Sequence, residues 1–227
     1  DGGSAGLWNI TPSTAQTATP GDYSFTYVAG KLNITPMTIT TTVVNQATTY
    51  GAPAATSSIV SGTINNDTVT TGIAAYSGVT PVTIEAKTAA GNYTLRADGN
   101  LSGDYAADYV LATTGNTDGQ LVVNQKTVTA SLIGSVSKEY DGTVAISNLL
   151  SGNYTIASGI ESGDSITLNN PSNGVYDNKN ATTGKVVSVS GLAIAGGTGA
   201  SNYQLASTSA SANMGVISAK PVTLTAP

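Results

Sequence analysis

Carboxylates are the main residues in this sequence that could carry out chemistry. The 227 residues include 13 acidic and 8 basic side chains, with no histidine and no cysteine. Imidazole triads, thiol nucleophiles and ordinary zinc sites are therefore excluded, and carboxylate pairs or Ser-Lys arrangements remain. The acidic residues closest in sequence are Asp104 with Asp108, Glu139 with Asp141, and Glu161 with Asp164. Because no aromatic cluster accompanies these pairs to bind a sugar, we interpret them as solvated loop acids.

Calcium is the one cofactor that the acidic residues leave open as an alternative. Asp98, Asp104, Asp108 and Asp118 lie in one region rich in glycine and asparagine. Oxygen ligands in loops suit Ca²⁺, but the spacing of an EF-hand loop is missing and these acids do not recur in the second half of the chain. The sequence therefore predicts no catalytic residue, no cofactor and no metal, with calcium as the alternative.

The segment Tyr140-Asp141-Gly142 has a structural explanation that needs no catalysis. A strand end followed by an Asp-Gly turn uses the tyrosine ring for packing, the aspartate as a cap and the glycine for the turn. Its counterpart Tyr50-Gly51 keeps the position but lacks the carboxylate. We therefore interpret all five residues as a structural motif, and we expect Gly142 to have a positive φ.

An internal repeat gives the strongest signal in the sequence. A similar boundary pattern occurs at residues 32–40, 121–129 and 215–223, with periods of 89 and 94 residues when Met37, Lys126 and Lys220 are aligned. A tyrosine that opens a short apolar run lies upstream of each boundary, at Tyr23, Tyr109 and Tyr203. Periodic units of this size indicate an array of similar domains. We expect the three tyrosines, which recur at equivalent positions, to lie in the core.

The composition predicts an all-β fold made of tandem small, β-rich, sandwich-like modules arranged end to end. Charged residues make up only 9% of the chain, and short apolar runs alternate with Gly, Thr, Ser and Asn. The apolar phase shifts at Gly191, where we expect a bulge or bend. The expected domains are the C-terminal part of a preceding repeat (1–36), two modules (37–125 and 126–219) and the start of a following repeat or linker (220–227).

Several of these segments resemble known repeat modules. Residues 138–143, 163–168, 184–189 and 202–205 look like the YDG repeat, and the likeness covers residues 126–219. Residues 49–53, 66–68, 91–93 and 108–109 resemble the related MBG module. Both modules are known from very long bacterial surface proteins, including filamentous-haemagglutinin-like adhesins exported by two-partner secretion. The resemblance implies an extracellular location at the bacterial cell surface and a repeat or stalk role without catalysis.

The expected function is therefore a non-enzymatic stalk that projects a binding region of a secreted adhesin. The alternative is a carbohydrate- or receptor-binding module that itself contacts the host or the matrix. The expected partners are neighbouring repeats of the same chain and a host glycan or protein receptor. Nucleic acid is disfavoured because the few basic residues are scattered among a larger number of acids. No apolar run is long enough for a membrane span and no signal-peptide pattern opens the sequence, so we expect a soluble interior fragment.

Overall fold

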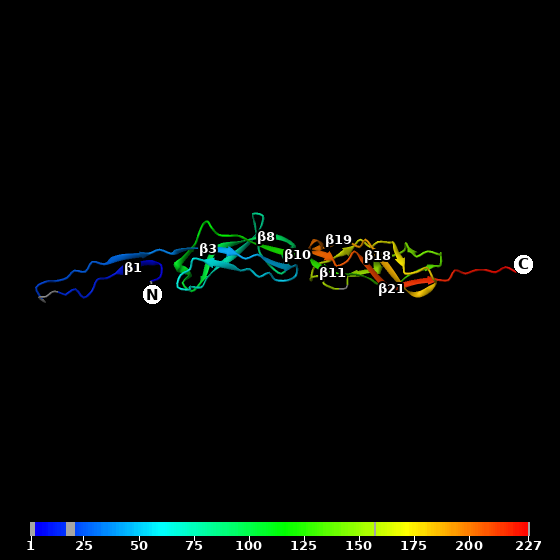
Figure 1. Cartoon of the computed structure of the whole chain (residues 1–227), viewed down its shortest axis with the longest axis horizontal. Coiled ribbons are helices and arrows are strands. Elements are labelled where there is room, and N and C mark those ends of the chain that lie inside the picture. The colour runs from blue at the N-terminus through cyan, green and yellow to red at the C-terminus, as the bar shows by residue number, and fades with distance from the viewer. Residues whose placement is uncertain (1–2, 17–20, 157, 227) are drawn as a thin grey trace. The chain divides into compact units, whose positions relative to one another are not determined.

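The computed structural model describes residues 3–16, 21–156 and 158–226. It confirms the all-β prediction, with strands β1 to β21 forming several sheets (Figure 1). Within the described ranges the helices are three short 3-10 turns, η1 (Ala106–Asp108), η2 (Ser151–Asn153) and η3 (Ala200–Asn202). No helix in that part of the chain has the length and apolar character needed to cross a membrane.

The chain forms two compact units, and each is discontinuous in sequence. The first comprises Asp1–Ala47, Ala54–Glu85 and Asn92–Val122. The second comprises Thr48–Pro53, Ala86–Gly91 and Val123–Pro227. The module boundaries drawn from the sequence repeat stay predictions.

The first unit begins with an antiparallel ribbon of β1 (Gly6–Ile10) and β2 (Gly30–Ile34), drawn in blue in Figure 1. Tyr23, in the loop between these strands, is 69% exposed, so the prediction that it lies in the core is wrong. Tyr109 opens a strand that pairs in parallel with residues 37–39, and Tyr203 opens one that pairs in parallel with residues 126–128. Among the described residues no strand precedes β1, and Tyr23 therefore has no such neighbour.

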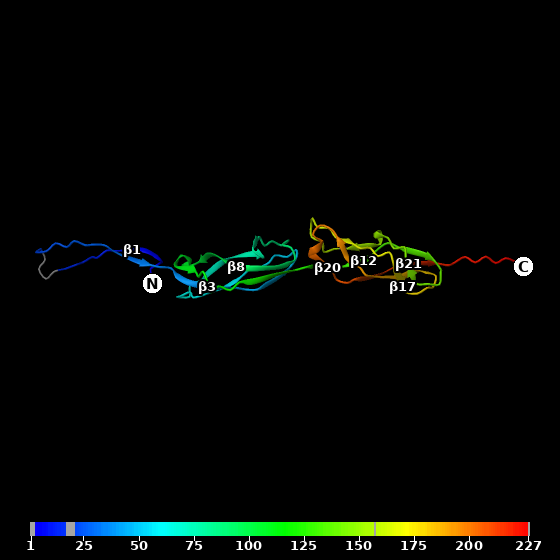
Figure 2. The same ribbon diagram turned by 90° about the horizontal axis from the view of Figure 1, so that it is seen from above.

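Most residues of two further sheets also belong to the first unit, and β3 and β8 of these sheets are labelled in Figure 2. The five-stranded sheet has the order β4 (Gln46–Thr49), β10 (Gly119–Asn124), β8 (Gly91–Gly103), β6 (Val69–Ser77) and β7 (Thr80–Val82). The three-stranded sheet has the order β5 (Ser58–Ser61), β3 (Met37–Val43) and β9 (Tyr109–Leu111). Ile39, Val69 and Tyr109 pack together as one buried cluster, which joins strands of both sheets.

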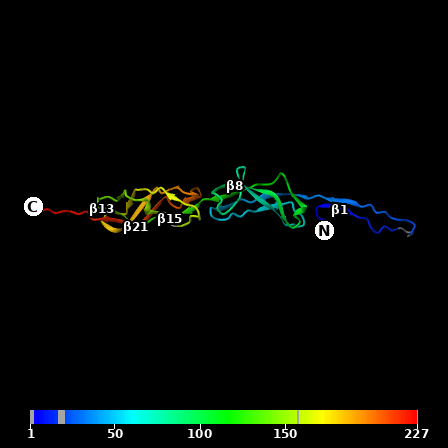
Figure 3. The same cartoon turned by 180° about the vertical axis from the view of Figure 1, so that it is seen from behind.

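The second unit contains one large sheet and three small ones, and its β13, β15 and β21 can be followed in Figure 3. The large sheet has the order β13 (Val136–Glu139), β21 (Ser209–Ser218), β18 (Thr182–Ser190), β17 (Gly174–Tyr176) and β14 (Ala145–Ile146). The two-stranded sheets pair β11 (Lys126–Val128) with β20 (Tyr203–Leu205), β12 (Ala130–Leu132) with β15 (Tyr154–Ile156), and β16 (Thr167–Leu168) with β19 (Ile194–Gly196). Its core is aliphatic with few aromatic side chains, and Val187, Leu192 and Ile217 are almost fully buried in it.

The two units repeat one pattern of strand pairing. In the first, β3 pairs in parallel with β9 and antiparallel with β5. In the second, β11 pairs in parallel with β20, and β12 pairs antiparallel with β15. The register is also repeated, since Met37 lies opposite Tyr109 and Lys126 lies opposite Tyr203. The two five-stranded sheets differ in their last edge strand. In the first unit the edge strand β7 directly follows its neighbour β6 in the sequence, whereas in the second the edge strand β14 precedes its neighbour β17.

Two glycines confirm predictions about local geometry. Gly191 has a φ of +74° and lies in the gap between β18 and β19, where the chain bends out of one strand before it starts the next. Gly142 has a φ of +80° in the turn after β13. In the same turn Asp141 Oδ1 accepts hydrogen bonds from the backbone N–H of Thr143 at 2.9 Å and from Lys138 Nζ at 2.8 Å. The predicted capping role of Asp141 is therefore confirmed.

Replacement of Gly142 by alanine tests how far this turn depends on left-handed backbone. A Cβ at Gly142 would meet no atom within 4 Å, so the cost arises from backbone strain alone. We expect Gly142→Ala to lower the free energy of unfolding by about 1 kcal/mol, measured by urea denaturation.

The matched control is Gly152→Ala in η2 of the same unit. Gly152 is also free of neighbours within 4 Å, but its φ lies outside the left-handed region. This change should leave the free energy of unfolding unchanged or slightly raised. Equal losses for the two variants would contradict the assignment of strain to Gly142.

Candidate functional site

Asp164 lies at the centre of a group of polar side chains in the second unit. Its carboxylate gathers Tyr50, Lys87 and Tyr203, which are far from it in sequence. We call these four residues the Asp164 cluster. Asp164 was expected to be a solvated loop acid, but only 8% of its side chain is exposed, so that interpretation is wrong.

Both oxygens of the Asp164 carboxylate accept hydrogen bonds. Oδ2 receives the hydroxyl of Tyr50 at 2.8 Å and the hydroxyl of Tyr203 at 2.7 Å. Oδ1 receives Lys87 Nζ at 3.1 Å, and Lys87 Nζ also donates to the carbonyl of Ser162 at 2.7 Å. Hydrogen bonds from charged or strongly polarised donors are the usual condition for holding an ionised carboxylate away from water.

A tight turn and a strand start place Asp164 against Tyr203. The backbone N–H of Asp164 donates to the carbonyl of Glu161 at 3.0 Å, which closes the turn. The backbone N–H of Glu161 in turn donates to the Tyr203 hydroxyl at 2.8 Å. Tyr203 follows η3 directly and begins β20, whose pairing with β11 fixes the position of the tyrosine.

Tyr50 reaches the cluster from the end of β4. Its backbone N–H donates to the carbonyl of Asn124 at 2.9 Å, and its ring meets the Tyr203 ring edge-on with centroids 5.4 Å apart. Glycine suits the next position because Gly51 has a φ of +90°, where other residues are strained. A Cβ there would also require the end of the Glu161 side chain to move. The Tyr-Gly dipeptide therefore fits closely beside the 161–164 turn.

Two further contacts surround the cluster. The Asn202 side-chain oxygen, in the last position of η3, accepts the backbone N–H of Ala90 at 2.9 Å. Lys126, at the start of β11, forms an ion pair with Glu161. Segments 48–53 and 86–91 are thus held in the second unit by hydrogen bonds from both side chains and main chain to the rest of that unit.

The pKa shifts in the Asp164 cluster favour an ionised carboxylate and protonated phenols. Burial, followed by the hydrogen bond to Asp164, raises the pKa of Tyr203 to about 12. Burial and the same carboxylate also raise the pKa of Tyr50. The hydrogen bonds from Tyr203 and Tyr50 lower the pKa of Asp164. Near neutral pH the carboxylate is ionised and both phenols are protonated, so the arrangement suits a permanent structural contact better than proton transfer.

The first unit contains a counterpart of this arrangement. Tyr109 donates to Asp67 Oδ2 at 2.6 Å, and the backbone N–H of Ile64 donates to the Tyr109 hydroxyl at 3.1 Å. The hydrogen bond to Asp67 is the main cause that raises the pKa of Tyr109. Asp108, at the end of η1, accepts the backbone N–H of Ala5, as Asn202 accepts that of Ala90. The Asp–Tyr pair, the N–H of the turn and the acceptor at the end of the 3-10 segment are therefore built twice in one chain.

The structure brings together only some of the residues singled out in the sequence. Tyr50, Gly51 and Tyr203 meet at the Asp164 cluster, whereas Tyr109 belongs to the counterpart in the first unit. The segment 140–142 forms its own turn in the second unit. There the hydrogen bond from Lys138, aided by Thr143, lowers the pKa of Asp141 to about 2.

Three of the four acids considered for calcium have other partners, and one of them is Asp108, which accepts the backbone N–H of Ala5. Asp118 forms an ion pair with Arg96 at 2.9 Å, and Asp98 accepts the backbone N–H of Asn100 at 2.9 Å. In residues 3–16, 21–156 and 158–226 no group of three or more acidic side chains is arranged to hold a metal ion.

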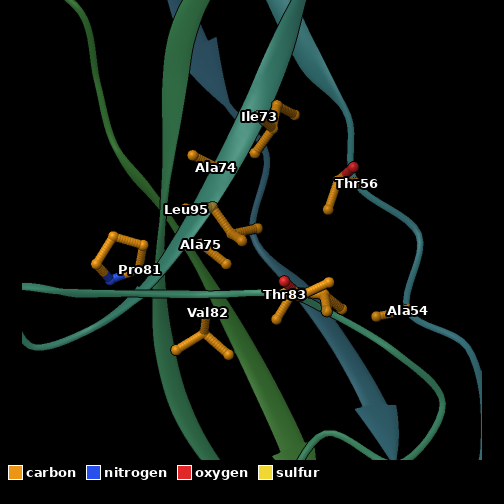
Figure 4. Close-up of a pocket in the computed structure, with 10 residues that line it drawn as sticks. Ala54, Thr56, Ile73, Ala74, Ala75, Pro81, Val82, Thr83 and Leu95 are labelled. Carbon is orange, nitrogen blue, oxygen red and sulfur yellow. The ribbon is translucent and has the colours of Figure 1, made fainter.

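An apolar cavity of about 420 Å³ lies in the first unit (Figure 4). Pro81, Val82 and Thr83 on one segment lie beside Ala75 and Leu95 of the large sheet. The side chains that line the cavity are aliphatic apart from two threonines and include no titratable group. The cavity therefore offers apolar contact area but no acid, base or nucleophile.

Asp164, Asp67 and Lys87 are the residues whose roles sequence reasoning missed. A signal was present, because an aspartate precedes the repeated tyrosine by 42 residues in the first unit and by 39 in the second. Lys87 has no such counterpart in the pattern, and its 77-residue separation from Asp164 gives no local cue.

Comparison with known proteins identifies part of the chain. The family model of the YDG domain matches residues 124–210, so this stretch is similar to a YDG-type module. The comparisons with curated proteins and with solved structures gave no match.

Replacement of Tyr203 by phenylalanine tests the Asp164 cluster. Tyr203→Phe removes one of the two hydroxyl donors to Asp164 and the acceptor of the Glu161 N–H. We expect the free energy of unfolding to fall by about 2 kcal/mol in urea denaturation. Tyr23→Phe, at an exposed site, is the control and should change nothing measurable. An equally stable Tyr203→Phe protein would show that the cluster does not stabilise the fold.

The raised pKa of Tyr203 predicts a loss of stability in alkali. Because the folded-state pKa is about 12 and an ordinary tyrosine has one near 10, the hydroxyl contributes its full stabilisation below pH 10 and loses it towards pH 12. The free energy of unfolding should therefore fall across this window, and Tyr203→Phe should flatten that fall while Tyr23→Phe keeps it. Denaturation curves at half-unit pH steps measure the difference, and identical pH profiles for all three proteins would exclude the linkage.

Proposed function

We propose that this chain is a non-enzymatic repeat region of a secreted bacterial cell-surface adhesin of the filamentous-haemagglutinin-like, two-partner secretion type, and that it acts as a stalk. The observation that carries the proposal is the recurrence of one polar arrangement in both units. The pairs Asp67–Tyr109 and Asp164–Tyr203 have matching turns, matching 3-10 segments and matching strand starts. Such duplication is typical of arrays in which each unit has the same architectural task.

The chemistry of the Asp164 cluster supports a structural role over catalysis. A catalytic carboxylate needs access to a substrate and a pKa suited to proton transfer or nucleophilic attack. The Asp164 carboxylate instead has both oxygens engaged by protein donors and a lowered pKa. Its surroundings therefore favour a fixed contact.

We propose that neighbouring repeats of the same chain are the main partners of the stalk and that the stalk lies outside the cell.

A receptor-binding role is the second candidate, and the apolar cavity of Figure 4 is the observation that favours it. The walls around Val82 and Leu95 would suit an apolar side chain of a protein receptor. No aromatic ring lines this cavity to stack on a sugar, which makes a carbohydrate ligand a poorer fit there. Binding of the purified chain to a glycan array or to immobilised host matrix proteins would favour this second candidate.

The stalk proposal predicts an elongated particle in solution. A compact globule of 227 residues has a radius of gyration of roughly 17 Å. We expect small-angle X-ray scattering to give a radius well above that value, because a stalk must hold its ends apart. A radius close to the compact value would contradict the proposal and favour a single binding domain with an internal duplication.

A further inference from the structure

A second cavity, of about 630 Å³, lies in the first unit beside the Asp67–Tyr109 pair. Thr35, Met37 and Ile64 contribute to its walls. We call it the Asp67 cavity. Unlike the cavity of Figure 4, it is lined by the charged side chains Asp67 and Asp108 as well as by polar and apolar ones.

The sequence repeat relates the Asp67 cavity to the Asp164 cluster position by position. The aligned boundaries match Thr35 to Asn124 and Met37 to Lys126. The repeated turn matches Ile64 to Glu161 and Asp67 to Asp164, and the repeated strand start matches Tyr109 to Tyr203.

In the second unit these same positions surround the Tyr50–Gly51 dipeptide. Asn124 accepts the backbone N–H of Tyr50, and Asp164 accepts its hydroxyl. Tyr203 packs edge-on against the Tyr50 ring, and Glu161 lies against Gly51. These four contacts of the dipeptide in the second unit thus map onto walls of the Asp67 cavity in the first.

We propose that the Asp67 cavity, together with the edge of β2, binds an extended strand that ends in Tyr-Gly and comes from another repeat of the same kind. The tyrosine hydroxyl donates to Asp67, and the ring packs against Tyr109. This inference rests on the proposed function, because it names the partner that the repeat array presents to the first unit.

The edge of β2 supplies the main-chain half of this site. Within the described residues, β2 pairs with β1 on one side only and the two strands form a separate ribbon. In the corresponding part of the chain β10 lies between β8 and β4, and β4 is the strand that leads into Tyr50. A strand added to β2 would gain the hydrogen bonds of a sheet ladder, as in other cases of recognition by strand addition.

The side chains of the Asp67 cavity also select the residues next to the Tyr-Gly pair of the bound strand. The ion pair of Lys126 with Glu161 is replaced by Met37 and Ile64, which are 41% and 50% exposed. Contact with these two side chains would favour a small apolar residue after the glycine, as Ala52 follows Gly51. The carboxylates of Asp67 and Asp108 favour a nearby lysine in the partner, in the role that Lys87 has beside Asp164.

A tethered strand tests the proposal in the full chain. The sequence of residues 46–53, Gln-Ala-Thr-Thr-Tyr-Gly-Ala-Pro, would be attached in front of Asp1 through about 20 Gly/Ser residues, whose average span is roughly 25 Å. Such a linker gives an effective strand concentration in the millimolar range, so weak binding is detectable. Amide hydrogen exchange of β2 should become about tenfold slower than in the untethered chain.

Two variants and one control make the result specific. A tether with phenylalanine in place of its tyrosine, and Asp67→Asn in the tethered chain, should each reverse most of the slowing. Asp22→Asn, an exposed carboxylate in the β1–β2 loop, should leave it intact. Unchanged exchange with the original tether would overturn the proposal. Slowing that survives both variants would also overturn it, because strand pairing would then occur without the cavity.

The oligomeric state of the chain tests whether a second copy of it, and not a strand from another repeat, occupies the Asp67 cavity. If the tether has no effect while the untethered chain forms a dimer in analytical ultracentrifugation that Asp67→Asn dissociates, a second copy binds the cavity and the proposal is wrong. These readouts are local to β2 or to association, whereas the stalk proposal is tested by the radius of gyration of the chain, so either can fail alone.

Discussion

The hydrogen bond between an aspartate and a buried tyrosine is the constraint on which both units depend. It joins a turn to a strand that pairs in parallel with β3 in the first unit and with β11 in the second, in Asp67–Tyr109 and again in Asp164–Tyr203. A buried phenol without an acceptor costs about 1 to 3 kcal/mol, and a buried carboxylate without donors costs more. Each group therefore requires the other, and the turn and the strand are fixed together.

Tyr50 and Lys87 extend that bond in the second unit into a cluster that holds distant segments. The carboxylate of Asp164 receives donors that lie 114 and 77 residues away in the sequence. Because hydroxyl and ammonium groups satisfy an anion in a partly dry environment, the contact is strong without needing a large apolar surface. This explains how a chain with an aliphatic core and few aromatic residues can include segments 48–53 and 86–91 in its second unit.

Features that depend on neighbouring residues could be predicted from the sequence, whereas contacts between residues far apart in the sequence could not. Alternating apolar residues predicted the all-β fold, and an Asp-Gly turn and a phase shift predicted the geometry of Gly142 and Gly191. The burial of Tyr109 and Tyr203 followed from their recurrence, but the same argument failed for Tyr23, which has no partner strand among the described residues. The partners of Asp164 could not be predicted, since no periodic pattern records a hydrogen bond across more than 70 residues.

The differences between the two copies show which parts of the arrangement are free to vary. The aspartate, the tyrosine and the backbone donor of the turn are kept in both units, because each satisfies another buried group. The residues around this centre, which we call the rim, differ between the units. Lys126 and Glu161 form an ion pair in the second unit, and Met37 and Ile64 lie at the matching positions in the first. An apolar side chain pressed against the ion pair would strip water from two charges, whereas the same side chain against Met37 and Ile64 would bury only apolar surface. The constant centre therefore provides the attachment, and the variable rim determines which neighbouring sequence fits it.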